Sequence, residues 1–377
     1  MLLTGALGGS KGLRARAAFK LLKLGGAFKF KSFSIKGLGG QVAVDSSVLP
    51  KSLSSWKNPL EEVVSRRLAD IEPKSLGEAI RSACKGGKRI RPLISLWFGA
   101  AHGVDRDSSL GVACLTEWLH NAFLIHDDIQ DGDAWRRDEP TLWKSHGTAT
   151  ALNAADWLLS QVYSEISQLS VEDSVRSRLL QAVSDVHRRT VEGQQLDLGG
   201  RADSRFQLSD YERLVKSKTG RYLALGMVCA AILADFDEDR VNALWRVGDQ
   251  MGPAFQIQDD LLDLTPEKGR GGAFGNDIRE GKPSILFAHS VQSESLSEAE
   301  RKRLVDIMAL PREETSDSEV EECIALFQKT GSIDFARSEA KSRSKTGLEL
   351  FASISGLSGE VLQEFEMICT YMTDRSR

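Results

Sequence analysis

Apolar residues recur at steps of three and four along most of this chain, which is the spacing of an amphipathic helix. One such stretch carries Leu179, Leu180, Val183, Val186, Val191 and Leu198. Polar residues occupy its opposite face. The same pattern covers residues 60–82, 108–130, 148–168, 240–264 and 320–352. No Val- and Ile-rich alternation bounded by hairpin turns appears, so we predict an all-α chain without strands.

At least two segments are apolar on nearly every side, which predicts helices at the centre of the molecule. The longest apolar run, from Tyr222 to Ala234, has 13 residues. A helix needs ~20 such residues to cross a bilayer. We therefore predict a buried helix here and no transmembrane segment. The whole pattern predicts one large helical-bundle domain whose helices surround a single core.

Composition and charge narrow the class of protein. The 377 residues are 41% hydrophobic, 27% charged and 7% aromatic, which is typical of a soluble globular protein and excludes disordered, collagen-like and membrane classes. The net charge is −4, yet residues 1–44 carry six Lys, two Arg and no acidic residue, so the rest of the chain carries −12. An acidic body argues against a nucleic-acid partner, which is bound through Lys and Arg. The acidic body remains compatible with a diphosphate ligand that is bound through metal ions.

The uneven charge also predicts the domain organisation. Residues 1–47 form a basic leader, residues 48–59 contain Ser and Pro and are expected to be a linker, and residues 60–377 form the main domain. The leader mixes apolar and basic residues, as a transit peptide, a membrane-surface segment or a flexible basic tail does. We accordingly expect a soluble protein of the cytoplasm, or of a plastid or mitochondrial matrix if the leader is a transit peptide.

Two acidic clusters have the pattern DDxxD, and they consist of Asp127, Asp128, Asp131, Asp259, Asp260 and Asp263. Residues four apart on a helix lie on one face within ~5–6 Å between Cβ atoms, so each cluster makes a two-carboxylate face. One copy alone is typical of a solvated helix face. Two copies embedded in apolar sequence instead favour a site for a hard divalent cation. Mg²⁺ takes one or two carboxylates plus water and phosphate oxygens, and Mn²⁺ is a substitute ion.

Basic residues complement these clusters. The segment from Gly86 to Pro92 presents Lys88, Arg89 and Arg91 after a flexible glycine pair, which suits a phosphate group. Taken alone, it is equally compatible with a surface basic patch. Further cations occur along the chain at Arg136, Arg137, Lys218 and Lys282. Their combination with the acidic clusters predicts a site for a highly charged anion.

Together these motifs resemble the trans-isoprenyl diphosphate synthase family, the all-α prenyltransferases that make farnesyl, geranylgeranyl and longer diphosphates. The resemblance runs from about Leu60 to the C-terminus. It rests on the segments 86–92, 120–141, 193–197, 218–219, 255–263 and 277–282. It implies a helical bundle with a central active-site cavity. The implied reaction is a head-to-tail condensation of isopentenyl diphosphate with an allylic diphosphate, whether dimethylallyl, geranyl or farnesyl.

The resemblance also implies roles for single residues. Asp127, Asp131 and Asp259 match the Mg²⁺ ligands that hold the allylic diphosphate, with Asp128, Asp260 and Asp263 as supports. The isopentenyl diphosphate site is matched by Lys88, Arg91, His120 and Arg137. Arg136 matches a cation on the allylic side. The residues around the leaving diphosphate and the developing carbocation are matched by Lys218, Thr219, Gln256 and Lys282.

The resemblance also implies that the growing chain runs past the helix that carries Asp127, toward the N-terminus of that helix, so that the residues before Asp127 limit product length. Phe123 and Ala122 form the first floor of the chain-binding tunnel, and Trp118 lies one turn further. A helix turn rises ~5.4 Å, roughly one isoprene unit. Small Ala122 opens the first floor and bulky Trp118 blocks the next, so geranylgeranyl diphosphate is the first choice of product, with farnesyl diphosphate and longer chains as alternatives. The alternative is that Phe123 and Trp118 are ordinary core residues.

Some features depart from the family pattern or leave other functions open. The family usually has a loop lysine where this chain has Gly272, and Arg270 or Lys268 could replace it.

The same motifs also bear on other functions. A terpene cyclase or head-to-head synthase would not need the segment with Lys88 and Arg91 to bind a second, homoallylic diphosphate. A non-catalytic regulatory subunit would be expected to lose aspartates, whereas both clusters are complete. The resemblance further implies a homodimer.

Overall fold

The structure, a computed structural model, describes residues 49–137, 139–265 and 274–373. The leader, Lys268, Arg270 and Gly272 lie outside these ranges. The chain is almost wholly helical, which confirms the predicted all-α class, and its only sheet within the described ranges joins two strands of two residues each. Those strands, β1 (Trp135–Arg136) and β2 (Glu139–Pro140), form an antiparallel hairpin directly after the first aspartate cluster.

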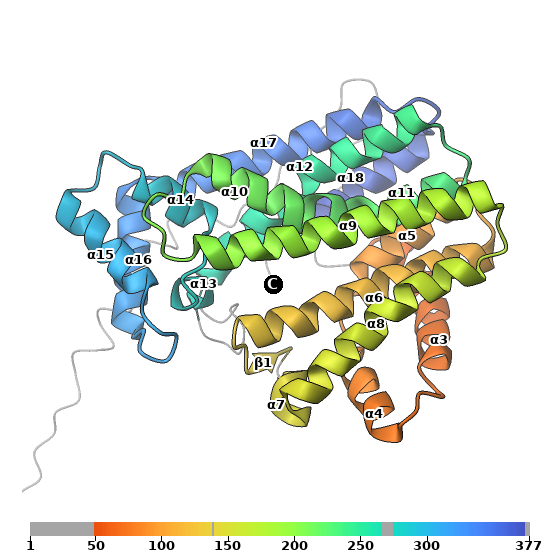
Figure 1. Cartoon of the computed structure of the whole chain (residues 1–377). Coiled ribbons are helices and arrows are strands. Elements are labelled where there is room, and N and C mark those ends of the chain that lie inside the picture. Colours follow the sequence, from red (N-terminus) through yellow and green to blue (C-terminus); the bar gives the residue numbers. More distant parts are fainter. Residues whose placement is uncertain (1–48, 138, 266–273, 374–377) are drawn as a thin grey trace, which may run out of the picture.

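The first half of the chain contributes the helices that form one side of the molecule (Figure 1). They are α2 (Lys51–Ser54), α3 (Lys57–Arg67), α4 (Lys74–Ala83), α5 (Ile90–Ala101), α6 (Arg106–Gln130), α7 (Leu142–His146), α8 (Thr148–Gln168) and α9 (Asp173–Gly200). Two of them, α6 and α8, pack along each other for most of their length. Asp105 begins α6 by accepting a hydrogen bond from the Ser108 backbone, the usual N-cap arrangement.

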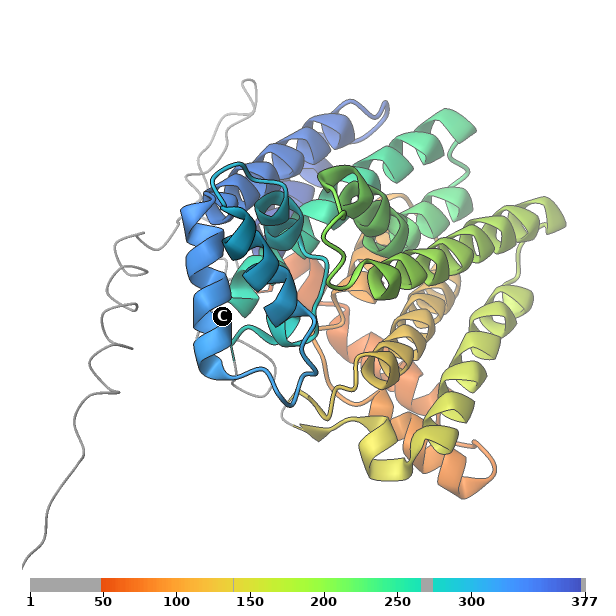
Figure 2. The same cartoon turned by 60° about the vertical axis from the view of Figure 1, so that its left-hand side comes forward.

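The second half closes the bundle. Its helices are α10 (Leu208–Val215), the π-helix η1 (Lys216–Gly220), α11 (Arg221–Leu233), α12 (Glu238–Asp263), α13 (Asn276–Arg279), α14 (Ile285–Val291), α15 (Glu298–Met308), α16 (Asp317–Lys329), α17 (Ser332–Ala352) and α18 (Gly359–Thr373). Figure 2 brings α14, α15 and α16 forward as a group at one end of the molecule. Capping boxes at Ser297 and Ser316 begin α15 and α16.

Three segments differ from the sequence prediction. Residues 60–82 and 320–352 each form two helices, because Pro73 begins α4 and the left-handed Gly331 (φ +70°) separates α16 from α17. Residues 51–59, expected to be a linker, form α2 and the start of α3. Leu53 of α2 is fully buried. Because the Leu53 side chain packs in the core, residues 51–59 belong to the folded domain and do not form a linker.

The predicted buried helix is confirmed as α11, in which every residue from Tyr222 to Ile232 is buried. It packs against α5, α6, α9 and α12, so it needs an apolar surface on all sides. No helix among the described residues is long and apolar enough to span a membrane.

Buried apolar side chains form two clusters, whereas the sequence predicted a single core. The larger cluster involves α2 to α9, α11 and α18, and the smaller involves α10 and α13 to α16. Two helices contribute to both: α12 with Val247 in the first and Ile257 in the second, and α17 with Phe351 in the first and Ile333 in the second. These two helices therefore join the clusters.

Close approach of α9, η1 and α12 depends on glycine. A Cβ atom on Gly252 of α12 would lie 2.5 Å from the Cα of Gly220, and one on Gly193 of α9 would lie 2.5 Å from the backbone nitrogen of Lys218. Both distances are well below van der Waals contact with backbone atoms, which cannot move away as a flexible side chain can. These glycines therefore fix how near Lys218 and Thr219 come to α9 and α12.

Gly252→Ala should destabilise the fold by about 1–3 kcal/mol, since the methyl group forces α12 away from η1. Urea unfolding followed by circular dichroism measures the change. Gly199→Ala is the matched control, because a Cβ there meets no atom within 4 Å. Equal stability of the two variants would contradict the proposed close packing.

Candidate active site

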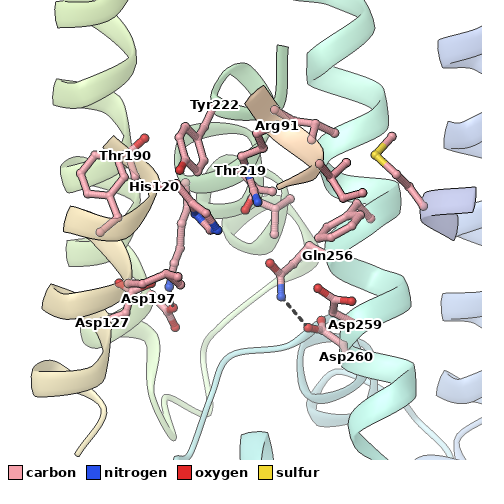
Figure 3. Close-up of a pocket in the computed structure, with 18 of the residues that line it drawn as sticks. Arg91, His120, Asp127, Thr190, Asp197, Thr219, Tyr222, Gln256, Asp259 and Asp260 are labelled. Atoms are coloured by element: carbon pink, nitrogen blue, oxygen red, sulfur yellow. Dashed lines mark hydrogen bonds and ion pairs between the residues drawn. The ribbon is translucent and has the colours of Figure 1, made fainter. Parts of the chain in front are cut away.

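A cavity of about 800 Å³ lies between α5, α6, α9, η1, α11 and α12. Figure 3 shows Asp127 and Asp197 on one wall and Asp259 and Asp260 on the other. The two aspartate clusters predicted from the sequence therefore face the same space from different helices, and lysines, arginines and apolar side chains also line it.

The first cluster lies at the C-terminal end of α6, where Asp127 and Asp131 line the cavity. Burial raises the pKa of Asp127, although Lys218 nearby opposes that shift. Asp131 pairs with Arg201 at the end of α9. Asp128 points elsewhere and accepts from Arg136, with 2.6 Å between Nε and Oδ1. Two carboxylates of this cluster thus face the cavity, as the four-residue spacing predicts.

The second cluster ends α12, and all three of its aspartates line the cavity. Asp260 accepts hydrogen bonds from the Gln256 amide at 2.9 Å and from the Tyr211 hydroxyl at 3.3 Å. Burial, reinforced by the negative charge of Asp277, raises the pKa of Asp260 to about 8 and that of Asp263 to about 6. This wall therefore carries more carboxylates than its own cations neutralise, which favours the entry of a cation.

These carboxylates suit Mg²⁺ in one specific manner. Among the described residues, no three His, Cys, Asp or Glu side chains converge to form a ready metal cage. Mg²⁺ commonly uses only one or two carboxylates and completes its octahedron with water and phosphate oxygens. Oxygen donors spread over two facing walls fit an ion that is bound together with a diphosphate.

Two lysines lie among the aspartates. The Lys218 amine of η1 is 2.6 Å from Asp197 of α9, and the Lys282 amine is 3.0 Å from Asp277. Burial opposes the charge on Lys218, yet Asp127 and Asp197 outweigh it and raise its pKa. The Lys218 amine therefore stays protonated beside the cavity. The sequence indicated both lysines but not their partners, since Asp197 and Asp277 lie in recognised segments without an assigned role.

The glycine-rich segment forms another corner of the cavity. Gly86 and Gly87 both have positive φ, and a Cβ on Gly87 would lie 2.8 Å from the Arg137 guanidinium. Lys88, Arg91, His120 and Arg137 all line the cavity, as predicted. The Arg91 guanidinium lies 4.8 Å from the centre of the Tyr222 ring. Four predicted residues from three separate segments thus meet at one place.

Arg89 behaves differently from the other cations of this segment. Its guanidinium pairs with Glu117 at 2.5 Å and with Glu61 at 2.8 Å, and its side chain is 2% exposed. A hydrogen bond to the Cys84 carbonyl adds a third partner. The expectation that three cations of the segment serve a phosphate is therefore corrected to two, because Arg89 is already neutralised by buried carboxylates.

Thr219 and Gln256 approach the middle of the cavity from η1 and α12 (Figure 3). The Gln256 nitrogen donates to Asp260, which leaves its carbonyl oxygen available to face the cavity. Arg136 lines the cavity too, but its guanidinium contacts Asp128 and, at 3.7 Å, Asp133. Arg136 thus has carboxylate partners of its own.

The three residues predicted to control product length separate in the structure. Phe123 lines the cavity and its ring meets Tyr222 at 5.6 Å between centroids, whereas neither Ala122 nor Trp118 lines it. At 3.6 residues per turn, Ala122 points about 140° and Trp118 about 180° away from Asp127. The Trp118 indole accordingly donates to Glu165 of α8.

Comparison with known proteins agrees with this geometry. The family model described as polyprenyl synthetase matches residues 73–327. A geranylgeranyl pyrophosphate synthase of Geoglobus acetivorans is 32% identical over 75% of this chain and 86% of its own length. The geranylgeranyl pyrophosphate synthetase of Pyrococcus horikoshii Ot3 has a TM-score of 0.77 at 29% identity, over 86% of this chain and 97% of that one. A polyprenyl synthase from Caulobacter crescentus CB15, complexed with calcium and isoprenyl diphosphate, shares the fold with a TM-score of 0.76 at 21% identity, over 90% of this chain and all of that one.

The environment of His120 predicts how stability depends on pH. Burial, followed by the charges of Arg91 and Arg137, lowers the pKa of His120 well below its usual range, so the folded protein holds the neutral ring. The unfolded chain takes up this proton below about pH 6.5, which favours unfolding. Stability should therefore fall as pH decreases from 6.5, by up to about 1.4 kcal/mol per pH unit from this residue.

Urea unfolding at pH 7.5, 6.5 and 5.5 tests this expectation. His120→Gln should lose less stability over that interval than the wild type. His146→Gln, at an exposed position, serves as control and should follow the wild type. If His120→Gln has the same pH dependence as the wild type, the neutral buried ring is refuted.

Proposed function

Because the chain belongs to the polyprenyl synthetase family and is a prenyltransferase, we propose that it condenses isopentenyl diphosphate with an allylic diphosphate to form geranylgeranyl diphosphate. One observation carries the proposal. Aspartates of α6 and α12 face each other across a cavity that also contains Lys218, Lys282 and Arg91. Such a site accommodates two diphosphates, one among the aspartates and one beside the glycine-rich segment.

The allylic diphosphate is assigned to the aspartate walls. Asp127, Asp131 and Asp259 would hold Mg²⁺, with Asp128, Asp260 and Asp263 as supports. Mg²⁺, when bound, neutralises diphosphate oxygens and favours departure of that group. The amine of Lys218, paired with Asp197, and that of Lys282, paired with Asp277, lie where the leaving group develops its negative charge. Arg136 supports this side by holding Asp128.

Heterolysis of the allylic C–O bond leaves a carbocation, which must be kept from water. The Thr219 backbone carbonyl and the Gln256 amide oxygen are the dipoles assigned to stabilise it. Phe123 and Tyr222 exclude water from the apolar end of the cavity. The positive centre then forms a bond with the terminal alkene carbon of isopentenyl diphosphate, and a proton leaves, with the departing diphosphate as its acceptor.

Isopentenyl diphosphate is assigned to the opposite corner. Lys88, Arg91 and Arg137 supply positive charge, and neutral His120 donates or accepts a hydrogen bond without adding charge. A head-to-head synthase or cyclase would not need this second cationic corner for a homoallylic diphosphate. A regulatory subunit would have no need for the complete aspartate walls. Both features favour head-to-tail catalysis by this chain.

Product length is assigned to Phe123. Its ring lies four residues before Asp127 and lines the cavity, so it narrows the tunnel about one turn below the reacting carbon. A partial block at this level favours a product of intermediate length, geranylgeranyl diphosphate. Farnesyl diphosphate follows if Phe123 closes the tunnel completely, and longer chains if it turns aside.

A homodimer is the proposed assembly. Leu180 is 38% and Val191 53% exposed, and their separation of eleven residues puts them on the same face of α9. Leu152 on the neighbouring α8 is 43% exposed. An apolar face of this kind is more stable when covered by a second copy of the chain.

Elongation assays test the proposed reaction. Purified protein with Mg²⁺, isopentenyl diphosphate and each allylic primer should give a prenyl diphosphate that chromatography sizes as C20. Asp127→Asn and Asp259→Asn should each lower kcat on the order of 10²-fold or more, since each removes a charge that holds the metal. Circular dichroism should show both variants folded. No elongation with any primer would exclude the proposed reaction, and wild-type rates in the variants would exclude the metal assignment.

Substitutions along α6 test the assignment of product length. Phe123→Ala should lengthen the product by at least one isoprene unit, because it removes the ring that narrows the cavity. Trp118→Phe is the control, since this side chain faces α8, and its product should match the wild type. A longer product from Trp118→Phe with no change in Phe123→Ala would place the floor at Trp118 instead.

A further inference from the structure

Arg312 lies in the connection between α15 and α16, far in sequence from either aspartate cluster. Its Nη1 atom is 2.5 Å from the Asp133 carboxylate, 179 residues away in the chain. The same guanidinium lies 3.2 Å from Glu280 and 3.4 Å from the side-chain oxygen of Asn276. One arginine therefore contacts the loop after the first cluster and the helix α13 after the second.

The partners of Arg312 are buried. The side chain of Asp133 is 1% exposed and that of Glu280 is fully buried. A buried carboxylate is stable only when its charge is compensated. Glu280 has a second cation in Lys282 at 3.7 Å, and Asp133 has Arg136 at 3.7 Å. Of these ion pairs between described residues, the shorter one of each carboxylate is with Arg312.

Two of these partners lead to an aspartate of a cluster, Asp133 through Arg136 and Asn276 directly. On one side, Arg136 contacts both Asp133 and Asp128 of the first cluster. On the other, the Asn276 amide donates to Asp263 of the second cluster at 3.3 Å. A continuous series of polar contacts thus runs from Asp128 through Arg136, Asp133, Arg312 and Asn276 to Asp263. Arg312 is the link in this series that comes from neither wall.

We propose that Arg312 is a positioning residue for prenyl transfer, which holds the two aspartate walls at the separation that a metal-bridged diphosphate requires. It touches neither substrate and acts through Asp133 and Asn276. The inference rests on the proposed function of the cavity. Its planar guanidinium reaches four partners at once, namely the carboxylates of Asp133 and Glu280, the side-chain oxygen of Asn276 and the backbone oxygen of Asp131. The single ammonium group of lysine cannot reproduce this set.

The test compares the wild type with Arg312→Gln, Arg312→Lys and the control Arg303→Gln. Arg303 also pairs with two carboxylates, Glu319 and Glu322, on the neighbouring α16. Its replacement therefore controls for the general effect of losing an arginine that pairs with two carboxylates. Arg312→Gln should lower kcat at least tenfold and raise the half-saturating Mg²⁺ concentration. The KM for isopentenyl diphosphate should stay within twofold, because its corner lies outside the series of contacts. Arg312→Lys should be intermediate, and Arg303→Gln should match the wild type.

Amide hydrogen exchange without metal or substrate supplies a readout independent of turnover. In Arg312→Gln, exchange should accelerate together at residues 131–136 and 274–282, while α9 and α11 keep wild-type protection. Absence of elongation in the wild type would contradict the proposed function and leave the exchange result to decide the role of Arg312. Unchanged exchange in both segments, or a parallel rise in KM for both substrates with loss of protection everywhere, would overturn the inference.

Discussion

The architecture of this protein depends on compensating the negative charge that α6 and α12 bring into one cavity. Aspartates buried on facing walls repel one another, and burial makes that repulsion stronger. The fold meets the problem with partners from other elements: Lys218 from η1, Arg201 from the end of α9, and Arg312 from the α15–α16 connection. The compensation is incomplete at the second cluster, where burial, followed by the charge of Asp277, raises the pKa of Asp260 to about 8 and so disfavours its charged form. A bound divalent cation would favour the charged form instead.

The helices could be predicted from the sequence because they follow from local patterns, whereas the central cavity is implied by the family resemblance. Spacing of three and four residues predicts α6, α8, α9 and α12, and a DDxxD pattern places two carboxylates on one face of each cluster helix. The Lys88 to Arg91 segment and Lys218 could likewise be identified from motifs. Each of these predictions needs only residues that are neighbours along the chain.

The partners of the aspartates could not be predicted in this manner. Arg201 pairs with a residue 70 positions away and Arg312 with one 179 positions away, so their roles depend on tertiary packing. Arg89 lies in a recognised segment, yet Glu117 and Glu61 turn it into the interior. The residues at the floor of the cavity depend on tertiary structure in the same way. Trp118 and Ala122 are close to Asp127 along the chain, yet the orientation of α6 directs both away from the cavity lining. The boundary between α16 and α17 at Gly331 and the short helix α2 at residues 51–54 do not follow from the sequence pattern. A single glycine and a single buried leucine give weak local signals.

Facing carboxylate walls have one direct thermodynamic consequence, which is that the cavity should bind a diphosphate only together with a divalent cation. Isothermal titration of the wild-type protein with inorganic diphosphate, with and without Mg²⁺, measures this coupling without any turnover. We predict binding in the presence of Mg²⁺, at least tenfold weaker binding in its absence, and loss of the difference when Asp127 is replaced by Asn. Diphosphate binding of equal affinity with and without Mg²⁺ would contradict the account.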